Sequence, residues 1–158
     1  MTVRNVAIRA ACREDLEPVL EQLRGASLPT EGVAEWFDEF IVAAEGEAIV
    51  GAAGLERYGS DVLLRSVVVS PEWQGRGLGS DLVAEALGRA SRSGARAAFL
   101  LTTTAEHYFP RHGFTRIERD EVPDGVRESV EFQIACPATA AVMMRRLTSS
   151  DDAVRADQ

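Results

Sequence analysis

A β-branched run that leads straight into a glycine-rich bend most constrains what this chain can fold into. Residues 67–82 read Val-Val-Val-Ser-Pro-Glu-Trp-Gln-Gly-Arg-Gly-Leu-Gly-Ser-Asp-Leu, and from Leu78 apolar residues recur at helical spacing as far as Ala90. This succession predicts a buried strand, a tight turn and an amphipathic helix joined without a linker. The alternation of strands and helices along the chain is typical of a mixed α/β domain.

The glycines of the bend predict an anion site. A turn of this kind leaves backbone N–H groups unpaired at the start of the helix, and the helix dipole adds positive potential there. Gly75, Gly77 and Gly79 permit the close approach of a phosphate. The side chain of Gln74 or Arg76 could add a donor or a charge. The stretch is neither a Walker loop nor the dinucleotide fingerprint, and the competing interpretation is a turn in which glycine serves packing alone.

Length and charge limit the classes of partner. The 158 residues fit one domain, and the net charge of −8 argues against nucleic acid or an anionic membrane as a partner. Cys12 and Cys136 form no Cys-x-x-Cys pair, which favours a reducing, cytoplasmic environment. His107 and His112 lack a completing cluster of ligands, so no metal site is expected. No apolar run approaches the ~20 residues of a membrane span, and no signal peptide is expected.

Periodicity predicts the remaining elements. Apolar spacing indicates a helix over residues 16–25, and short helices are expected over 33–37 and 105–112. Residues 126–134 are ambiguous between helix and strand. The predicted strands cover residues 3–11, 40–44, 48–55, 62–69, 97–101, 114–117 and 141–147. These elements indicate a single domain over residues 1–147, followed by a polar tail, 148–158, that we expect to be disordered.

Three motifs resemble the GNAT acetyltransferases. Residues 69–79 resemble the pyrophosphate-binding signature of that family, Gln/Arg-x-x-Gly-x-Gly/Ala after a valine-rich strand. Tyr108-Phe-Pro-Arg-His-Gly-Phe114 is similar to the family's Phe-Tyr-x-x-x-Gly-Phe helix end, and residues 143–147 resemble its last strand. The resemblance covers roughly residues 3 to 147. It implies the GNAT fold, in which a mixed, mostly antiparallel central sheet is flanked by helices.

A narrower resemblance is to the ArsN-type GNAT proteins, which are encoded with arsenic-resistance genes. It is carried by residues 28–29 (Leu-Pro), 54–59 (Gly-Leu-Glu-Arg-Tyr-Gly), 63–66 (Leu-Leu-Arg-Ser), 100–106 (Leu-Leu-Thr-Thr-Thr-Ala-Glu), 131–132 (Glu-Phe) and 136–137 (Cys-Pro). The genomic context of that branch does not establish a substrate.

The GNAT resemblance implies acetyl-CoA as the cofactor. It places the backbone of Val67 and Val69 along the pantetheine arm, in the manner of an added strand. It places the amides of the glycine bend around the pyrophosphate. The cofactor-binding residues implied in this way are Val67, Val68, Val69, Gln74, Gly75, Arg76, Gly77, Leu78, Gly79, Ser80, Thr102 and Phe109.

The implied reaction is attack of a neutral amine on the thioester carbonyl, with a thiolate leaving. The Val67 N–H would stabilise the developing oxyanion. The family often has a tyrosine four residues before the glycine of Gly-Phe, and this tyrosine acts as an acid toward the leaving thiolate. This chain has Phe109 at that position. Tyr108 is adjacent, but one helical step turns a side chain by about 100°. Either Tyr108 replaces that tyrosine, or the thiolate leaves without a dedicated acid; we favour the second, because a CoA-like thiol has a pKa of about 8.5.

The amine proton needs an acceptor, either a carboxylate or a chain of waters. Some family members carry a glutamate early in the strand before the signature, where this chain has Leu63 and Leu64. The candidate replacements are Glu56 and Glu131. For Glu56, the alternative is a solvated charge beside a turn.

Arg65 and Glu131 are the candidate substrate-binding residues. Arg65 lies two positions before Val67 and is expected on the same face of the strand, where a substrate carboxylate or Glu56 would pair with it. The alternative is an arginine that extends to the rim of the sheet.

The sequence thus predicts an acetyl-CoA-dependent N-acetyltransferase that transfers acetyl directly, in a ternary complex, to a small-molecule amine. An amino-acid-like amine or one bearing arsenic or a phosphinate fits the resemblance and Arg65. Two alternatives stay open: a non-catalytic acyl-CoA sensor, suggested by Phe109 and the leucine-filled base position, and a protein or peptide N-acetyltransferase. The family resemblance is compatible with a homodimer.

Overall fold

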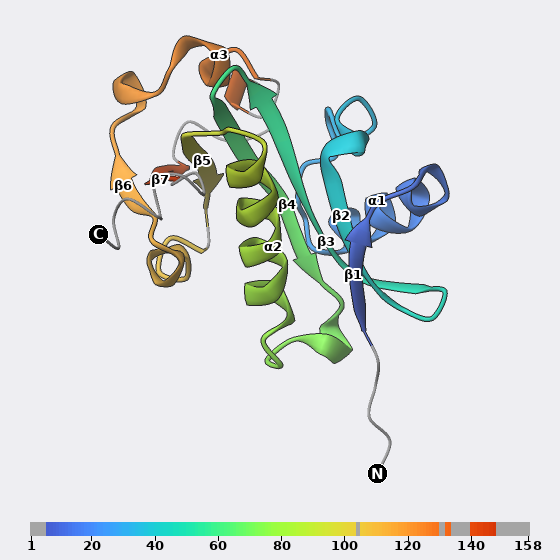
Figure 1. Cartoon of the computed structure of the whole chain (residues 1–158). Coiled ribbons are helices and arrows are strands. Elements are labelled where there is room, and N and C mark those ends of the chain that lie inside the picture. The colour runs from blue at the N-terminus through green and yellow to red at the C-terminus, as the bar shows by residue number, and fades with distance from the viewer. Residues whose placement is uncertain (1–5, 104, 130–131, 134–139, 148–158) are drawn as a thin grey trace, which may run out of the picture.

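The computed structural model describes residues 6–103, 105–129, 132–133 and 140–147 (Figure 1). Seven strands form one sheet in the order β1-β2-β3-β4-β5-β7-β6. Neighbouring strands run antiparallel, except for the parallel pair β4 and β5. The predicted fold, a mostly antiparallel sheet flanked by helices, is confirmed. The elements are β1 (Ala7–Ala10), α1 (Leu16–Gly25), β2 (Phe40–Glu45), β3 (Ala48–Tyr58), β4 (Asp61–Val69), α2 (Leu78–Arg92), β5 (Ala97–Thr102), β6 (Thr115–Ile117), α3 (Asp124–Arg127) and β7 (Ala141–Arg146).

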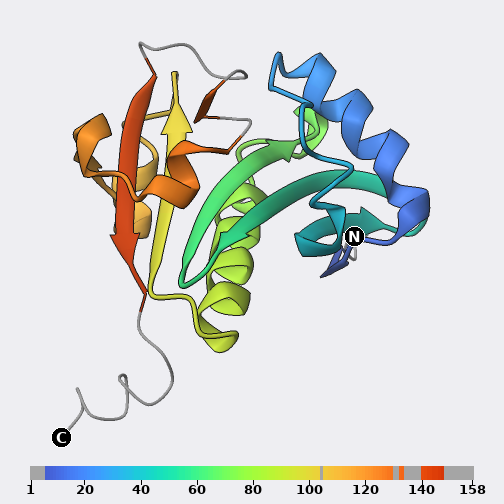
Figure 2. The same ribbon diagram turned by 90° about the horizontal axis from the view of Figure 1, so that it is seen from above.

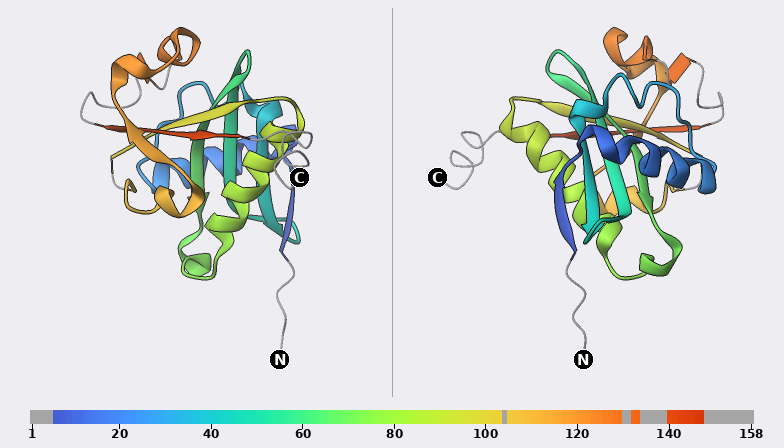
Figure 3. Two further views of the ribbon diagram at one scale, coloured as in Figure 1. Left: turned by 60° about the vertical axis from the view of Figure 1, so that its left-hand side comes forward. Right: turned by 90° about the vertical axis from the view of Figure 1, so that its right-hand side faces the viewer.

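Helices α1 and α2 cover opposite faces of the sheet (Figures 2 and 3). The apolar stripe of α2 packs on one face, and its Leu82 and Val83 are fully buried there. Side chains alternate between faces along a strand, so Leu64 of β4 joins this core and Leu63 joins a separate cluster with Val126 of α3 on the other face. None of the described helices combines the length and apolar character that crossing a membrane requires.

The two short helices differ from the prediction. Residues 31–36 form turns, and a short 3-10 helix, Phe37–Glu39, follows in place of the helix expected over 33–37. Over 105–112, turns lead into a 3-10 helix, Phe109–His112. Pro110 explains this difference, because it lacks the N–H that an α-helix would need at this point.

Element ends differ as well. Strand β3 runs to Tyr58, beyond the predicted end at residue 55, since its last residues pair with the start of β4. Of the ambiguous segment 126–134, residues up to Arg127 belong to α3. The first strand spans Ala7–Ala10 among the described residues. The predicted tail, 148–158, lies outside them.

Candidate active site

Strands β4 and β5 stay together over a short length only. Within the described residues, their parallel ladder joins 61–63 to 97–99. Beyond it, β5 continues beside β7 as far as Thr102, while β4 curves away, and the two strands form a V (Figure 2). An unpaired strand edge of this kind can accept another extended chain.

A β-bulge bends β4 inside the V. Gly54 pairs with Arg65 and Ala52 with Val68, so Ser66 and Val67 together stand opposite one residue of β3. Ser66 has a φ of +59°, which is uncommon for a residue with a side chain. Bulges redirect side chains and occur beside active sites.

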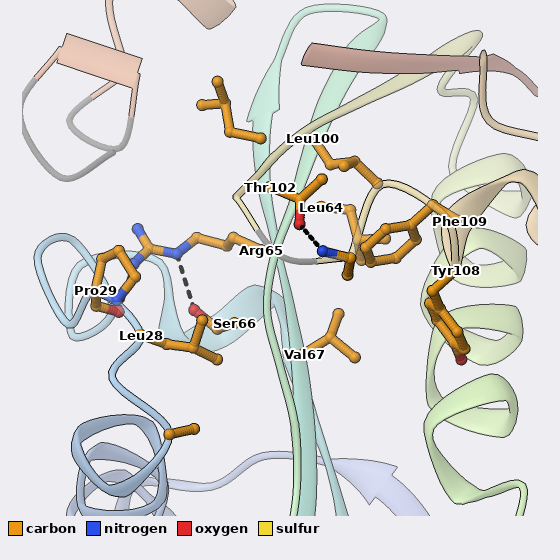
Figure 4. A pocket seen from close by; sticks show the side chains of 13 residues that line it. Leu28, Pro29, Leu64, Arg65, Ser66, Val67, Leu100, Thr102, Tyr108 and Phe109 are labelled. Carbon is orange, nitrogen blue, oxygen red and sulfur yellow. Dashed lines mark hydrogen bonds between the residues drawn. The ribbon is translucent and has the colours of Figure 1, made fainter. Parts of the chain in front are cut away.

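The bulge overturns the expectation that Arg65 and Val67 share a face. Val67 packs against the core beneath α2, whereas Arg65 lies on the other side, toward Pro29 (Figure 4). Side chains normally alternate between the two faces of a strand, but the extra residue of the bulge interrupts this alternation. Arg65 and Val67 are two positions apart and therefore lie on opposite faces.

A cavity of about 320 Å³ occupies the V, and we call it the strand cavity. Thr102, Tyr108 and Phe109 line one side of it, and Leu28 and Pro29 line the other (Figure 4). The remaining lining residues are Ala26, Leu64, Arg65, Ser66, Val67, Leu100, Leu101 and Ala105. The lining is mainly apolar, as expected for a pocket that holds the arm of a cofactor and a small acceptor.

A second cavity, of about 360 Å³, lies at the glycine bend, and we call it the bend cavity. Its lining residues are Val67, Val69, Trp73, Gln74, Gly75, Gly77, Leu78, Gly79, Ser80, Tyr108 and Arg111. The φ angles of Gly75 and Gly77 are +79° and +84°, in the region that favours glycine. Gly77 caps α2 without a side chain, so the first amides of the helix depend on water or a ligand for acceptors. This geometry suits a diphosphate.

The two cavities meet at Val67 and Tyr108, which line both. The Tyr108 hydroxyl lies 3.1 Å from Ser80 Oγ and 3.2 Å from His112 Nε2. Phe109 instead is buried and packs edge-on against Phe114. Tyr108 therefore occupies the junction even though it is displaced by one position in sequence from the family's tyrosine.

Other predicted residues are placed elsewhere. The guanidinium of Arg76 lies 5.2 Å from the Trp73 ring centroid, and Arg76 is not part of the bend-cavity lining. Val68 packs on the α1 side of the sheet. Gln74 lines the bend cavity, but its amide donates to the Val69 carbonyl at 3.1 Å. Glu131 lies outside the described residues.

Glu56 is buried rather than solvated. One of its oxygens lies 2.7 Å from Arg65 Nη1, and the other accepts a hydrogen bond from the Tyr58 hydroxyl. Arg65 also donates to the Pro29 carbonyl at 3.3 Å. Burial, together with the bond to Glu56, raises the pKa of Tyr58 well above its usual range. Because both carboxylate oxygens have protein partners and Glu56 lines neither cavity, this geometry does not support Glu56 as the general base.

Arg111 is a site residue that sequence reasoning missed. It lines the bend cavity, and its guanidinium lies 4.9 Å from the ring centroid of Tyr108. The sequence feature that could have indicated Arg111 is its position between Tyr108 and Gly113, inside the motif that resembles the family's helix end. Leu28 and Pro29 belong to the narrower resemblance, which implied no role for them at the site.

The sequence matches a family model described as an acetyltransferase (GNAT) domain over residues 36–116, a span that includes β2 to β5, the V and the bend and ends within β6. The chain belongs to the GNAT family. Its relatives include an amino-acid acetyltransferase from Aeromonas salmonicida, 29% identical over an alignment of 126 positions that covers 73% of this chain and 28% of the relative. An amino-acid acetyltransferase from Ralstonia nicotianae is 30% identical over an alignment of 110 positions that covers 68% of this chain and 24% of the relative. The GNAT chain thus spans about a quarter of the length of these curated relatives.

Solved structures share the GNAT fold. N-acetylglutamate synthase from Neisseria gonorrhoeae, complexed with coenzyme A and N-acetyl-glutamate, matches with a TM-score of 0.79 at 23% identity, over 92% of this chain and 36% of that chain. The PaiA N-acetyltransferase from Thermoplasma acidophilum, in complex with coenzyme A, matches with a TM-score of 0.65 at 16% identity, over 90% of this chain and 99% of that chain.

Proposed function

We propose that this GNAT protein is an acetyl-CoA-dependent N-acetyltransferase that transfers acetyl directly to the amine of a small molecule. One observation carries the proposal: the bend cavity, with its helix-start amides, and the apolar strand cavity meet at Val67 and Tyr108. A cofactor with a diphosphate at one end and a thioester at the other would span this path. Solved proteins of the same fold that are complexed with coenzyme A support this assignment.

In the proposed complex, the amides from Gly75 to Ser80 bind the diphosphate, and Arg111 adds a positive charge. The pantetheine arm follows the open edge of β4 from Val69 to Val67, in the manner of an added strand. Thr102 and Phe109 form the opposite wall.

The acetyl carbonyl would then lie beside Val67. The amine nitrogen attacks the carbonyl carbon, the Val67 N–H stabilises the oxyanion, and the carbon–sulfur bond breaks with its electron pair on sulfur. We propose that Tyr108 gives its hydroxyl proton to this sulfur, because Tyr108 lines both cavities and its hydroxyl lies 3.1 Å from Ser80 Oγ of the bend cavity. Departure of the thiolate without an acid is the competing route.

We assign removal of the amine proton to water rather than to Glu56. The Glu56 carboxylate is committed to Arg65 and Tyr58, so its proposed role is to hold β4 and the loop at Pro29 in place. Arg65 lines the strand cavity and would form part of the wall of the acceptor site. Glu56 balances the charge of Arg65.

The acceptor class follows from relatives as well as from the cavity. The named amino-acid acetyltransferases and the complex with N-acetyl-glutamate favour an amino-acid-like amine. The ArsN-type resemblance adds amines that bear arsenic or a phosphinate. We further propose that residues 1–147 form one acetyltransferase domain, that the protein is cytoplasmic and that it forms a homodimer.

Release of free thiol from acetyl-CoA tests the proposal, measured across amino acids, amino-phosphinates, arsenic-bearing amino acids and a short peptide. Calorimetry with acetyl-CoA is run first. Binding followed by amine-dependent thiol release is expected. Binding without release for any amine would instead indicate a sensor, release with the peptide alone would indicate a peptide acetyltransferase, and absence of binding would overturn the proposal.

A further inference from the structure

The Tyr108 hydroxyl has two side-chain neighbours from separate parts of the fold. Ser80 Oγ, in the first turn of α2, lies 3.1 Å away, and His112 Nε2, at the end of the 3-10 helix, lies 3.2 Å away. A phenol hydroxyl has one proton to donate and can accept further bonds. At most one of these neighbours can therefore receive the phenol proton.

We propose that His112 is a positioning residue for Tyr108: its Nε2–H donates to the phenol oxygen and leaves the phenol proton free for the cofactor sulfur. This inference rests on the proposed function. It assigns a role to a side chain that lines neither cavity and that acts through Tyr108 alone.

The surroundings of His112 suit a neutral donor. Partial burial and the positive charges of Arg111 and Arg145 lower the pKa of His112, which favours the uncharged ring with one N–H. Arg111 belongs to the same 3-10 helix, and Arg145 reaches the site from β7. Tyr108 is in direct contact with the ring.

The backbone holds His112 in place. Arg145 Nη1 donates to the His112 carbonyl at 2.9 Å, which ties the end of the 3-10 helix to β7. The rings of Tyr108 and His112 are 5.2 Å apart between centroids. The hydrogen bond is thus made by two side chains whose positions are fixed by packing and by a second strand.

The proposed step balances as follows. The carbon–nitrogen bond forms, the carbon–sulfur bond breaks, and the sulfur takes the proton from Tyr108 Oη. The phenol oxygen becomes anionic, and the bond from the His112 N–H becomes charge-assisted and stronger. The proton lost by the amine nitrogen then returns through water to Tyr108.

A double-mutant cycle tests this role with the thiol-release assay. We expect His112→Leu to lower kcat about tenfold, roughly the effect of one hydrogen bond to a developing charge, without changing the calorimetric affinity for acetyl-CoA. His112→Gln keeps an amide N–H and should recover most of the loss. In a Tyr108→Phe background, His112→Leu should have no further effect. His107→Leu, at an exposed neighbouring histidine, is the matched control.

Equal losses from His112→Leu in both backgrounds would overturn the inference, as would a Tyr108→Phe enzyme with unchanged kcat. A second readout does not need activity: NMR titration of the two histidines in the wild type and in Tyr108→Phe. We expect the His112 midpoint to move and the His107 midpoint to stay. Identical His112 titration curves in the two proteins would overturn the inference, whether or not any amine is acetylated. Failure to acetylate any tested amine would count against the proposed function alone.

Discussion

Arg65 Nη1 and Glu56 Oε2 lie 2.7 Å apart, and the two side chains are 0% and 1% exposed. Desolvation of two charges is costly, so each charge depends on the other. The pair holds the bulged strand β4 against the loop that carries Pro29, and both of these segments line the strand cavity.

Removal of one partner should be strongly destabilising. Glu56→Gln removes the carboxylate charge that lies against the buried Arg65 guanidinium, and we expect the free energy of unfolding to fall by about 3–5 kcal/mol. Urea unfolding measures this change. The control is Glu39→Gln, which breaks the partly exposed pair with Arg57 and should cost about 0–1 kcal/mol. If Glu56→Gln costs no more than the control, the pair does not have this structural role.

Alanine at the bend should weaken cofactor binding. Gly77 has a φ of +84°, and a side chain there is strained by about 1–2 kcal/mol, so the bend should relax to a form whose amides no longer converge. We expect the calorimetric Kd for acetyl-CoA to rise about tenfold in Gly77→Ala. Gly25→Ala, at the end of α1 with open space around it, is the control and should bind normally. An unchanged Kd in Gly77→Ala would remove the bend from the binding site.

Loss of Arg111 should affect the same affinity through charge. Arg111 lines the bend cavity, and Arg111→Leu should raise the Kd for acetyl-CoA about tenfold at low salt. The difference from the wild type should shrink as ionic strength rises, because salt screens exposed charges. Arg92→Leu, at the far end of α2, should leave the Kd unchanged. A variant that binds like the wild type at low salt would show that Arg111 does not contact the diphosphate.

Acid should remove one local source of stability. The Arg9 guanidinium, 2.7 Å from Asp15, lowers the pKa of Asp15 from 3.8 to about 2. Because the folded pKa is below the unfolded one, the carboxylate stabilises the protein above about pH 4, and this contribution is lost as the pH falls toward 2.

The test is the difference in unfolding free energy between the wild type and Asp15→Asn, followed from pH 6 to pH 2. Since Arg9 is partly exposed, we expect about 1 kcal/mol at pH 6, disappearing at the acid end. A difference that does not change with pH would mean that the ion pair is not its source.

The strand, bend and helix over residues 61–92 could be predicted because local chemistry determines them. Glycines mark the positive φ angles, and the apolar stripe of α2 marks its buried face. The bulge could not be predicted, because Ser66 adopts a glycine-like φ that no sequence signal indicates. The burial of Glu56 depends on Arg65, Tyr58 and the distant Pro29 loop meeting in three dimensions.

Tyr108 shows the same limit at the site. If the segment were an α-helix, the Tyr108 side chain would point away from the junction. The segment instead forms a turn and a 3-10 helix, because Pro110 lacks a backbone N–H. The sequence therefore offered Tyr108 as a candidate by its residue type, while the direction of its side chain depended on a local geometry that periodicity does not report.

The position of bound acetyl-CoA tests the central claim most directly, and a crystal structure of the complex would give it. We predict the diphosphate within hydrogen-bond distance of the amides between Gly75 and Ser80, with the thioester carbonyl beside the Val67 N–H. A cofactor bound elsewhere, or a bend left empty at saturating acetyl-CoA, would contradict the account.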